Sequence, residues 1–178
     1  MRYALIGLLV SLLLFTSCGS NDTARTQAPT TDSVITDSSA NSADYSESEY
    51  DTVYVVVLDT NQNYYILQEK MYPLAAILGL VIDTMNRYYD LDKDRIVLNE
   101  NDEDEMYRGE YFPRRTESAT MSLEYYSLYD TSASEGNIAL VVGLFYEQPT
   151  ADSLLAIVRK DVPAAFMKPA RMYMGCIH

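Results

Sequence analysis

Tryptophan is absent from this chain of 178 residues, histidine occurs once, and cysteine occurs twice. Because the one histidine is His178, the last residue of the sequence, a Ser-His-Asp or Cys-His catalytic group is not indicated. Two cysteines are too few for a disulfide framework or a thiolate metal site. The 13 Lys and Arg residues stand against 26 Asp and Glu residues, and a net charge of −13 repels nucleic acid and anionic membrane surfaces. No nucleic-acid partner is therefore expected.

One long apolar run is present, from Ala4 to Phe15, and Arg2 precedes it. A helix needs about 20 residues to cross a hydrocarbon core of about 30 Å, so this run is too short to span a membrane. A buried surface helix would show polar positions every third or fourth residue, and this run leaves no polar face. The pattern is typical of a secretory signal peptide, which we place at residues 1–17.

The run closes with Leu14-Phe15-Thr16-Ser17-Cys18, which resembles the lipobox of Bacteroidetes lipoproteins. That resemblance implies that residues 1–17 are removed and that Cys18 carries lipid. Two or three acyl chains anchor a protein stably, since each buried CH₂ contributes about 0.8 kcal/mol. Gly19 stands where an aspartate often retains lipoproteins in the inner membrane, so the resemblance implies a lipid anchor in the outer membrane, facing the periplasm or the cell surface. Cys176 then lacks a disulfide partner and is expected as a small buried hydrophobe.

Residues 18–51 consist mostly of Ser, Thr, Asp, Asn and Ala. Such a segment buries too little apolar surface to offset its ordering entropy, so we expect a flexible tether. Three Asp-Ser/Thr-apolar tripeptides resemble the O-glycosylation site of Bacteroidetes, and they imply modification of Thr23, Ser33 and Thr52. In a linker rich in Ser and Thr the same tripeptides also arise from composition alone, so both interpretations stay open.

The remaining residues, 52–178, are enough for one domain with its own core. The β-branched run Val53–Leu58 predicts a central strand, and residues 59–63 predict a turn. A second strand is expected at Ser122–Tyr129, where apolar and polar residues alternate. The run Ile138–Phe145 predicts a third, wholly apolar strand.

A helix is expected over residues 66–78, where Pro73 either interrupts it or marks a second start. Gly79 is expected to cap its C-terminus, and Val81-Ile82 to return as a short strand. The expected core side of this helix comprises Ile66, Leu67, Met71, Leu74, Ile77 and Leu78.

A second helix is expected to start at Thr150 as N-cap and to end at Pro163, and a closing strand is expected at Ala165–Cys176. The expected core side of this helix comprises Leu154, Leu155, Ile157, Val158 and Val162. Two strand–helix–strand units in one short domain favour an α+β fold. We expect a split β-α-β antiparallel sheet of the ferredoxin-like kind, with both helices on one face and an irregular insertion at 83–121.

The second unit resembles the second half of a sporulation-related repeat (SPOR) domain. The likeness rests on Val142-Gly143-Leu144-Phe145, on Ala151–Leu155 and on Pro163–Phe166, and covers about residues 138–168. In the first half, Leu58-Asp59-Thr60 stands where such a domain has Gly-x-Phe. SPOR domains bind peptidoglycan glycan strands that lack peptide stems, so the resemblance implies a SPOR-like fold and a glycan ligand.

Tyrosines and arginines gather in the insertion. Sugars stack their C–H faces on aromatic rings and accept hydrogen bonds from forked donors, so this composition predicts a glycan site. Alternatively, the tyrosines cover the helix-free face of the sheet and the arginines pair with nearby acids. The candidate ligand-binding residues are Arg87, Tyr88, Tyr89, Tyr111, Phe112, Arg114 and Arg115.

Asp90, Asp92 and Asp94 have the spacing of a calcium loop, but Arg95 stands where that loop needs Gly and Asn101 where it needs Glu. We therefore expect a solvated turn without a metal. Nothing in the sequence selects two carboxylates as the acid and base of a glycosidase. A non-enzymatic protein without a cofactor is expected. It is either a glycan-binding lipoprotein of the cell envelope or an envelope assembly lipoprotein that docks a protein partner.

Replacing the lipidated residue tests the anchor directly. Cys18→Ala is expected to move the protein from the membrane fraction to the soluble fraction, because the acyl chains have no other attachment site. Cys176→Ala is the matched control and is expected to stay with the membranes. Recovery of the Cys18→Ala protein in the membrane fraction would contradict the lipobox interpretation.

Overall fold

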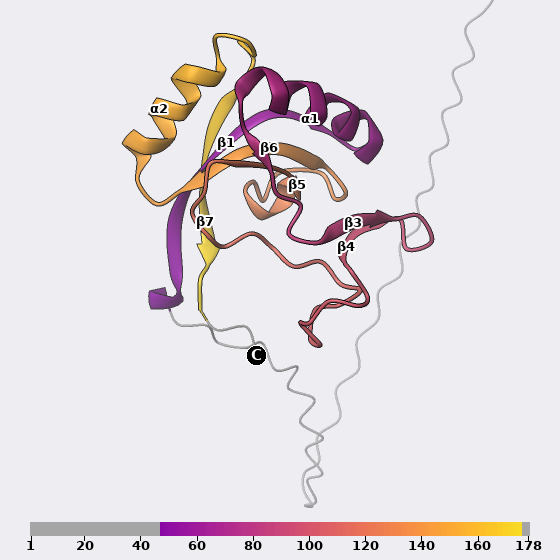
Figure 1. The fold of residues 1–178 in the computed structure, drawn as a ribbon. Helices are drawn as coiled ribbons and strands as arrows, with labels where there is room; N and C mark the ends of the chain where they lie inside the picture. The colour runs from indigo at the N-terminus through magenta and orange to yellow at the C-terminus, as the bar shows by residue number, and fades with distance from the viewer. Residues whose placement is uncertain (1–46, 176–178) are drawn as a thin grey trace, which may run out of the picture. The chain divides into compact units, whose positions relative to one another are not determined.

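The computed structural model describes residues 47–175 (Figure 1). The predicted signal peptide, the lipidated Cys18, the glycosylation candidates Thr23 and Ser33, and Cys176 lie outside the described residues. Along the chain the elements are η1 (Glu47–Glu49), β1 (Tyr50–Asn61), α1 (Tyr64–Leu78), β2 (Val81–Ile82), β3 (Arg87–Asp90), β4 (Arg95–Leu98), β5 (Thr120–Tyr125), η2 (Tyr126–Leu128), β6 (Ile138–Phe145), α2 (Gln148–Val158) and β7 (Phe166–Tyr173). Neither helix between residues 47 and 175 is long and apolar enough to cross a membrane.

The main sheet has the strand order β2-β5-β6-β1-β7. β6 pairs antiparallel with both β1 and β5, and β7 pairs antiparallel with β1. In this order β5 and β6 lie between β2 and β1, and β1 lies between β6 and β7. The α+β class is confirmed. The expectation of a wholly antiparallel sheet is wrong, because β2 joins β5 in parallel at the edge and makes the sheet mixed.

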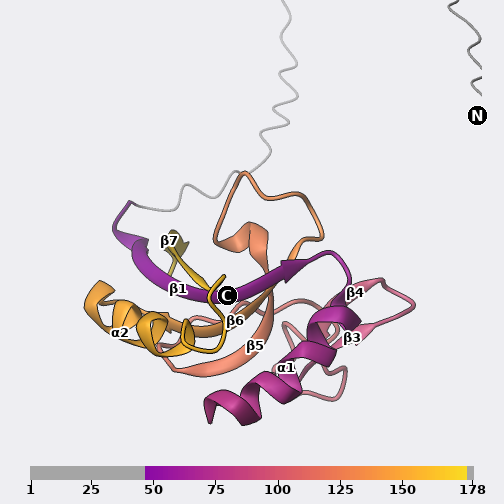
Figure 2. The ribbon, with the colours of Figure 1, turned by 90° about the horizontal axis from the view of Figure 1, so that it is seen from above.

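Both helices pack on the same face of the main sheet (Figures 1 and 2). The buried cluster on this side comprises Val56, Leu58, Tyr64, Leu67, Met71, Ala75, Ile96, Met121, Leu123, Ile138, Leu140, Val142, Phe145, Ala151, Leu155, Val158 and Ala165. The opposite face carries a second cluster, formed by Val53, Val55, Val57, Tyr129, Ala139, Val141, Leu144, Ala170 and Met172. Because Tyr129 and η2 pack over it, the helix-free face is not an open sheet surface.

The first helix starts at Tyr64, two residues earlier than expected, because the Asn63 side chain caps it. Asn63 Oδ1 accepts the backbone N–H groups of Tyr65 at 2.9 Å and Ile66 at 3.3 Å. Gly79 ends the helix with φ 65°, which confirms the expected C-terminal cap. The expectation that Pro73 breaks the helix is wrong, since α1 runs continuously through it. Pro73 lies on the exposed side, where water can reach the carbonyl that loses its N–H partner.

The helices turn some expected core residues to solvent. In α1 the buried residues are Tyr64, Leu67, Met71 and Ala75. Ile66 and Ile77 are 42% and 62% exposed, so their expected core positions are wrong. On α2, Ile157 is 55% exposed, while Ala151, Leu155 and Val158 are buried. Both buried sets recur every three or four residues, as one helical stripe requires.

Several boundaries differ from the expected ones. β1 begins at Tyr50 and continues through Asn61, so it includes residues that the sequence assigned to the tether and to a turn. α2 begins at Gln148 with Pro149 in its first turn and ends at Val158, whereas Thr150 was expected as its cap. β5 ends at Tyr125 and gives way to η2, and β7 ends at Tyr173. β6 and β2 have the expected bounds.

Gly143 sits where β6 passes directly under α2. A Cβ atom at this position would lie 2.5 Å from the Phe145 ring and 2.7 Å from the Leu154 side chain. Both contacts are far inside van der Waals distance, so any larger residue must displace them. The Val-Gly-x-Phe pattern of β6 thus has a packing reason in this chain.

Candidate functional site

The insertion is not wholly irregular, because its first part forms the two-stranded sheet β3–β4. Tyr88 and Tyr89 are neighbours on β3, so their side chains point to opposite faces of this ribbon. Tyr89 turns toward α1 and is partly buried, whereas Tyr88 is 39% exposed. The two rings cannot form one binding surface.

Arg87, on the same face of β3 as Tyr89, is buried against β5. Its Nη1 and Nη2 atoms donate to the two carboxylate oxygens of Glu124, each at 2.9 Å. Glu124 also accepts the Tyr111 hydroxyl at 2.7 Å and the Ser122 hydroxyl at 2.6 Å. Burial disfavours the charged form of Arg87. The charge and the hydrogen bonds of Glu124 outweigh this effect and raise the pKa of Arg87. We call Arg87, Tyr111, Ser122 and Glu124 the Glu124 network.

Arg114 is also buried, and it holds the end of the insertion on β5. Its guanidinium donates to the carbonyl oxygens of Thr120 at 3.0 Å and Ser118 at 2.7 Å, and to the hydroxyls of Ser118, Thr120 and Ser122. Burial lowers the pKa of Arg114. Since these oxygens occupy its donors, Arg114 has a structural role.

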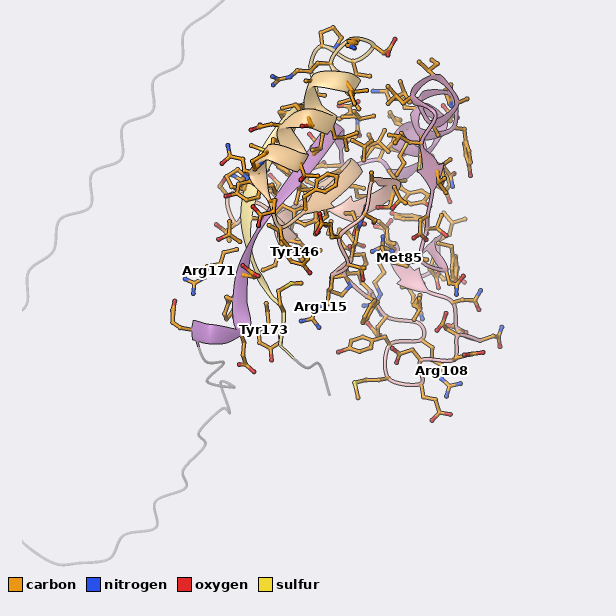
Figure 3. All side chains as sticks on the ribbon, turned by 60° about the vertical axis from the view of Figure 1, so that its left-hand side comes forward. Met85, Arg108, Arg115, Tyr146, Arg171 and Tyr173 are labelled. Carbon is orange, nitrogen blue, oxygen red and sulfur yellow. The ribbon has the colours of Figure 1, made fainter. Side chains whose placement is uncertain are left out.

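The other candidates lie apart from one another. Arg115 donates to the carbonyl oxygens of Tyr173 at 2.8 Å and Gly175 at 2.6 Å, and its guanidinium lies 5.5 Å from the Tyr173 ring centre (Figure 3). Phe112 meets the Tyr107 ring edge-on at 5.0 Å. The predicted site of seven residues is therefore not assembled. One of its members, Tyr89, lines a hollow together with the exposed ring of Tyr65.

Two adjoining hollows meet at Tyr89. The first has a volume of about 540 Å³. Its lining residues are Asn61, Gln62, Asn63, Tyr64, Tyr65, Tyr89, Leu91 and Asp94. The second has a volume of about 250 Å³. Its lining residues are Gln62, Tyr89, Asp94, Tyr125, Glu135, Gly136 and Ile138. Gln62, Tyr89 and Asp94 line both, so the two hollows adjoin at these three residues.

Three tyrosines hold each other in place in the first hollow. Tyr89 stacks on the buried Tyr64 with ring centres 4.9 Å apart, and Tyr65 meets Tyr64 and Tyr89 edge-on at 5.5 Å and 5.7 Å. Tyr64 and Tyr65 begin α1, while Tyr89 comes from β3, so the hairpin beside the start of α1 completes the group (Figure 2). Tyr65 is 42% exposed and presents an aromatic surface to the hollow.

Polar groups surround this aromatic surface. The Tyr89 hydroxyl donates to Asp94 Oδ1 at 2.6 Å, and this hydrogen bond, helped by burial, raises the pKa of Tyr89 to about 12. Asp94 itself has φ 52°, a left-handed turn conformation. Within residues 47–175 the side-chain amide of Gln62 makes no hydrogen bond, so its Oε1 and Nε2 atoms are open to a ligand.

A third hollow, of about 550 Å³, lies at the other end of the hairpin. It is lined by Asn86, Asn99, Asn101, Asp102 and Glu103, and contains no aromatic ring. At the turn between β3 and β4, Asp90 accepts the backbone N–H groups of Asp92 and Lys93, so its carboxylate stabilises the turn. No group of three or more His, Cys, Asp or Glu side chains between residues 47 and 175 is arranged to hold a metal ion.

The site residues predicted from the sequence did not include Tyr65 or the amide residues Asn61 to Asn63. These residues were assigned to a turn and to the start of a helix, and Asn63 does cap α1. The run Asn-Gln-Asn-Tyr-Tyr combines amides with aromatic rings, which is the composition of a sugar site, and was the signal available. Thr52, the third glycosylation candidate, lies exposed on β1 opposite Arg171, and its modification stays a prediction.

Compared with known proteins, this chain matches no protein-family model, no curated protein and no solved structure.

Removing the carboxylate of Glu124 tests the structural role of the network. Glu124→Ala is expected to lower the free energy of unfolding by about 3–5 kcal/mol, because Arg87 then stays buried without a counter-charge. Urea denaturation measures the loss. The control Glu117→Ala removes an exposed carboxylate and is expected to change stability by less than about 0.5 kcal/mol. A loss below about 1 kcal/mol for Glu124→Ala would show that the insertion is held by other contacts.

Proposed function

We propose that this protein is a non-catalytic lipoprotein of the cell envelope whose domain binds glycan chains at the two hollows around Tyr89. One observation carries the proposal: Tyr65 and Tyr89, two tyrosines held in place by Tyr64, border a hollow that also contains the side-chain amide of Gln62 and the carboxylate of Asp94. Aromatic rings take the C–H face of a sugar, while amides and carboxylates bond its hydroxyls.

The rigidity of the tyrosines supports binding. Each of the three rings contacts the other two, and the Tyr89 hydroxyl is fixed by Asp94. A surface that is ordered before the ligand arrives loses little conformational entropy on binding. The chemistry of the hollow thus supports a ligand with many hydroxyls and flat C–H faces.

Two sequence resemblances point to the same class of ligand. The lipobox at Cys18 implies attachment to a membrane of the envelope, and the tether to residue 51 gives the domain reach away from it. The SPOR-like residues of the second unit imply a peptidoglycan strand as the glycan. The lipobox and the tether support an envelope glycan in general, while the choice of a peptidoglycan strand rests on the SPOR resemblance alone.

Two tyrosines of similar exposure provide a matched test. Tyr65→Ala is expected to weaken glycan binding by about two- to twelvefold, because stacking on one ring contributes about 0.5–1.5 kcal/mol. Tyr88→Ala, on the opposite face of β3, is expected to bind as the wild type does. Chemical-shift titration with chito-oligosaccharides and peptidoglycan glycan fragments measures both affinities and also reports whether the fold is kept.

Three outcomes would count against this assignment. Binding of no glycan in the panel would refute the proposed function. Equal losses in Tyr65→Ala and Tyr88→Ala would place the site elsewhere. Cleavage of a bound oligosaccharide during the titration would refute the non-catalytic assignment.

A second candidate function is docking of an envelope protein on the outer side of α1. No charged residue occurs between Met71 and Ile82, although 22% of the chain is charged. On this stretch Tyr72, Ile77 and Val81 are 58%, 62% and 67% exposed. An uncharged, exposed apolar surface of this kind marks a protein-interaction site.

Matched substitutions that place a charged residue on each of the two helices test this docking surface. Ile77→Glu is expected to abolish capture of envelope proteins by the purified domain, because a buried carboxylate without a partner disfavours the complex. Ile157→Glu, at a similarly exposed position of α2, is expected to leave capture unchanged. Cross-linking followed by mass spectrometry measures capture, and equal capture by both variants would contradict docking on α1.

A further inference from the structure

The charge of the two hollows distinguishes between classes of glycan. Asp94 lines both hollows and Glu135 lines the smaller one, while no Lys or Arg among residues 47–175 lines either of them. The site therefore offers hydrogen-bond acceptors with negative charge and no cation to balance an acidic ligand. The preference that we infer from this charge rests on the proposed function, because it concerns the same site.

The basic residues on either side of Asp94 are engaged elsewhere. Lys93 Nζ lies 3.0 Å from Glu100 Oε1 and donates to the carbonyl oxygen of Gly109 at 3.1 Å. Arg95 Nη2 lies 2.9 Å from Glu110 Oε1. Both side chains pair with acids of the insertion and neither lines the hollows, although the charge of Arg95 acts on Tyr125 in the smaller one.

The carboxylates also suit the hydroxyls of an uncharged sugar. Asp94 Oδ1 accepts the Tyr89 hydroxyl, which leaves Oδ2 as an acceptor. Glu135 is exposed at the far end of the smaller hollow. A carboxylate can only accept hydrogen bonds, so sugar hydroxyls match it and a second carboxylate does not.

The shared lining gives the ligand a minimum length. Tyr65 lies in the larger hollow, Tyr125 and Glu135 lie in the smaller one, and Tyr89 lies between them. A single sugar unit on Tyr65 leaves the smaller hollow empty, whereas a chain can contact both. We propose that the site binds an uncharged oligosaccharide of at least two units across both hollows and disfavours acidic glycans through Asp94 and Glu135.

Two tetrasaccharides that differ in charge test this proposal. One is the neutral tetramer of N-acetylglucosamine, and the other is the peptide-free tetramer of alternating N-acetylglucosamine and N-acetylmuramic acid, whose lactyl groups are carboxylates. The full chain is titrated with each at low and at high salt. The neutral tetramer is expected to bind about tenfold more tightly at low salt, and added salt is expected to narrow the difference by screening.

Removal of the charge supplies the decisive comparison. Glu135→Gln and Asp94→Asn are expected to raise the ratio of the affinity for the acidic tetramer to the affinity for the neutral one severalfold, because each removes a negative charge and keeps a side chain of the same size. Glu103→Gln, in the hollow that has no aromatic ring, is the matched control and is expected to change neither affinity.

The outcomes separate this inference from the function it rests on. Equal or tighter binding of the acidic tetramer by the wild type overturns the charge preference while the glycan function stands. Equal affinity for the N-acetylglucosamine monomer and tetramer overturns the two-hollow ligand. Binding of neither tetramer overturns the proposed function itself, and this inference with it.

Discussion

The placement of the insertion depends on the hydrogen bonds that the buried carboxylate of Glu124 accepts. This carboxylate receives two hydrogen bonds from Arg87 on β3, one from Tyr111 and one from Ser122 on β5. A buried carboxylate is tolerated only when such donors surround it, so the segment that carries Arg87 and Tyr111 must close on β5. The same closure brings Tyr89, two residues after Arg87, against Tyr64. The candidate glycan site is therefore built by a structural ion pair on its far side.

Much of the fold follows from local sequence. β6 is a β-branched apolar run with clear ends, and Gly79 adopts the left-handed conformation that closes a helix, so both were predictable. The inward face of α1 was not. Between Met71 and Ile82 every residue is uncharged and most are apolar, and a periodicity cannot choose a face where all faces look alike. The parallel pairing of β2 depends on contacts far along the chain, which local pattern does not encode.

The site was harder to predict because neighbours in sequence separated in space. Strand alternation places the Tyr88 and Tyr89 side chains on opposite faces. Arg87 and Arg114 pack against β5, whereas Arg115 contacts the end of β7. The alternative that arginines pair with acids is what Arg87 does, though its partner is 37 residues away. Tyr65 and Gln62 lie at the site because β1 ends and α1 begins there. The polar residues 61–63 that join these two elements look like an ordinary turn in the sequence. A composition can predict the chemistry of a site while misplacing its members.

The proposed glycan site and the apolar surface both include residues of α1, but at different ends of this helix. Tyr65 and Ile77 are twelve residues apart on α1, which at 1.5 Å per residue places them about 18 Å apart. A sugar chain in the hollows contacts the first turn of α1, while a protein partner would cover its last turns and β2. Since neither ligand needs the other's residues, the two functions are compatible in one molecule. A tethered lipoprotein with both surfaces could hold a protein partner beside a glycan chain, and α1 would fix the distance between them.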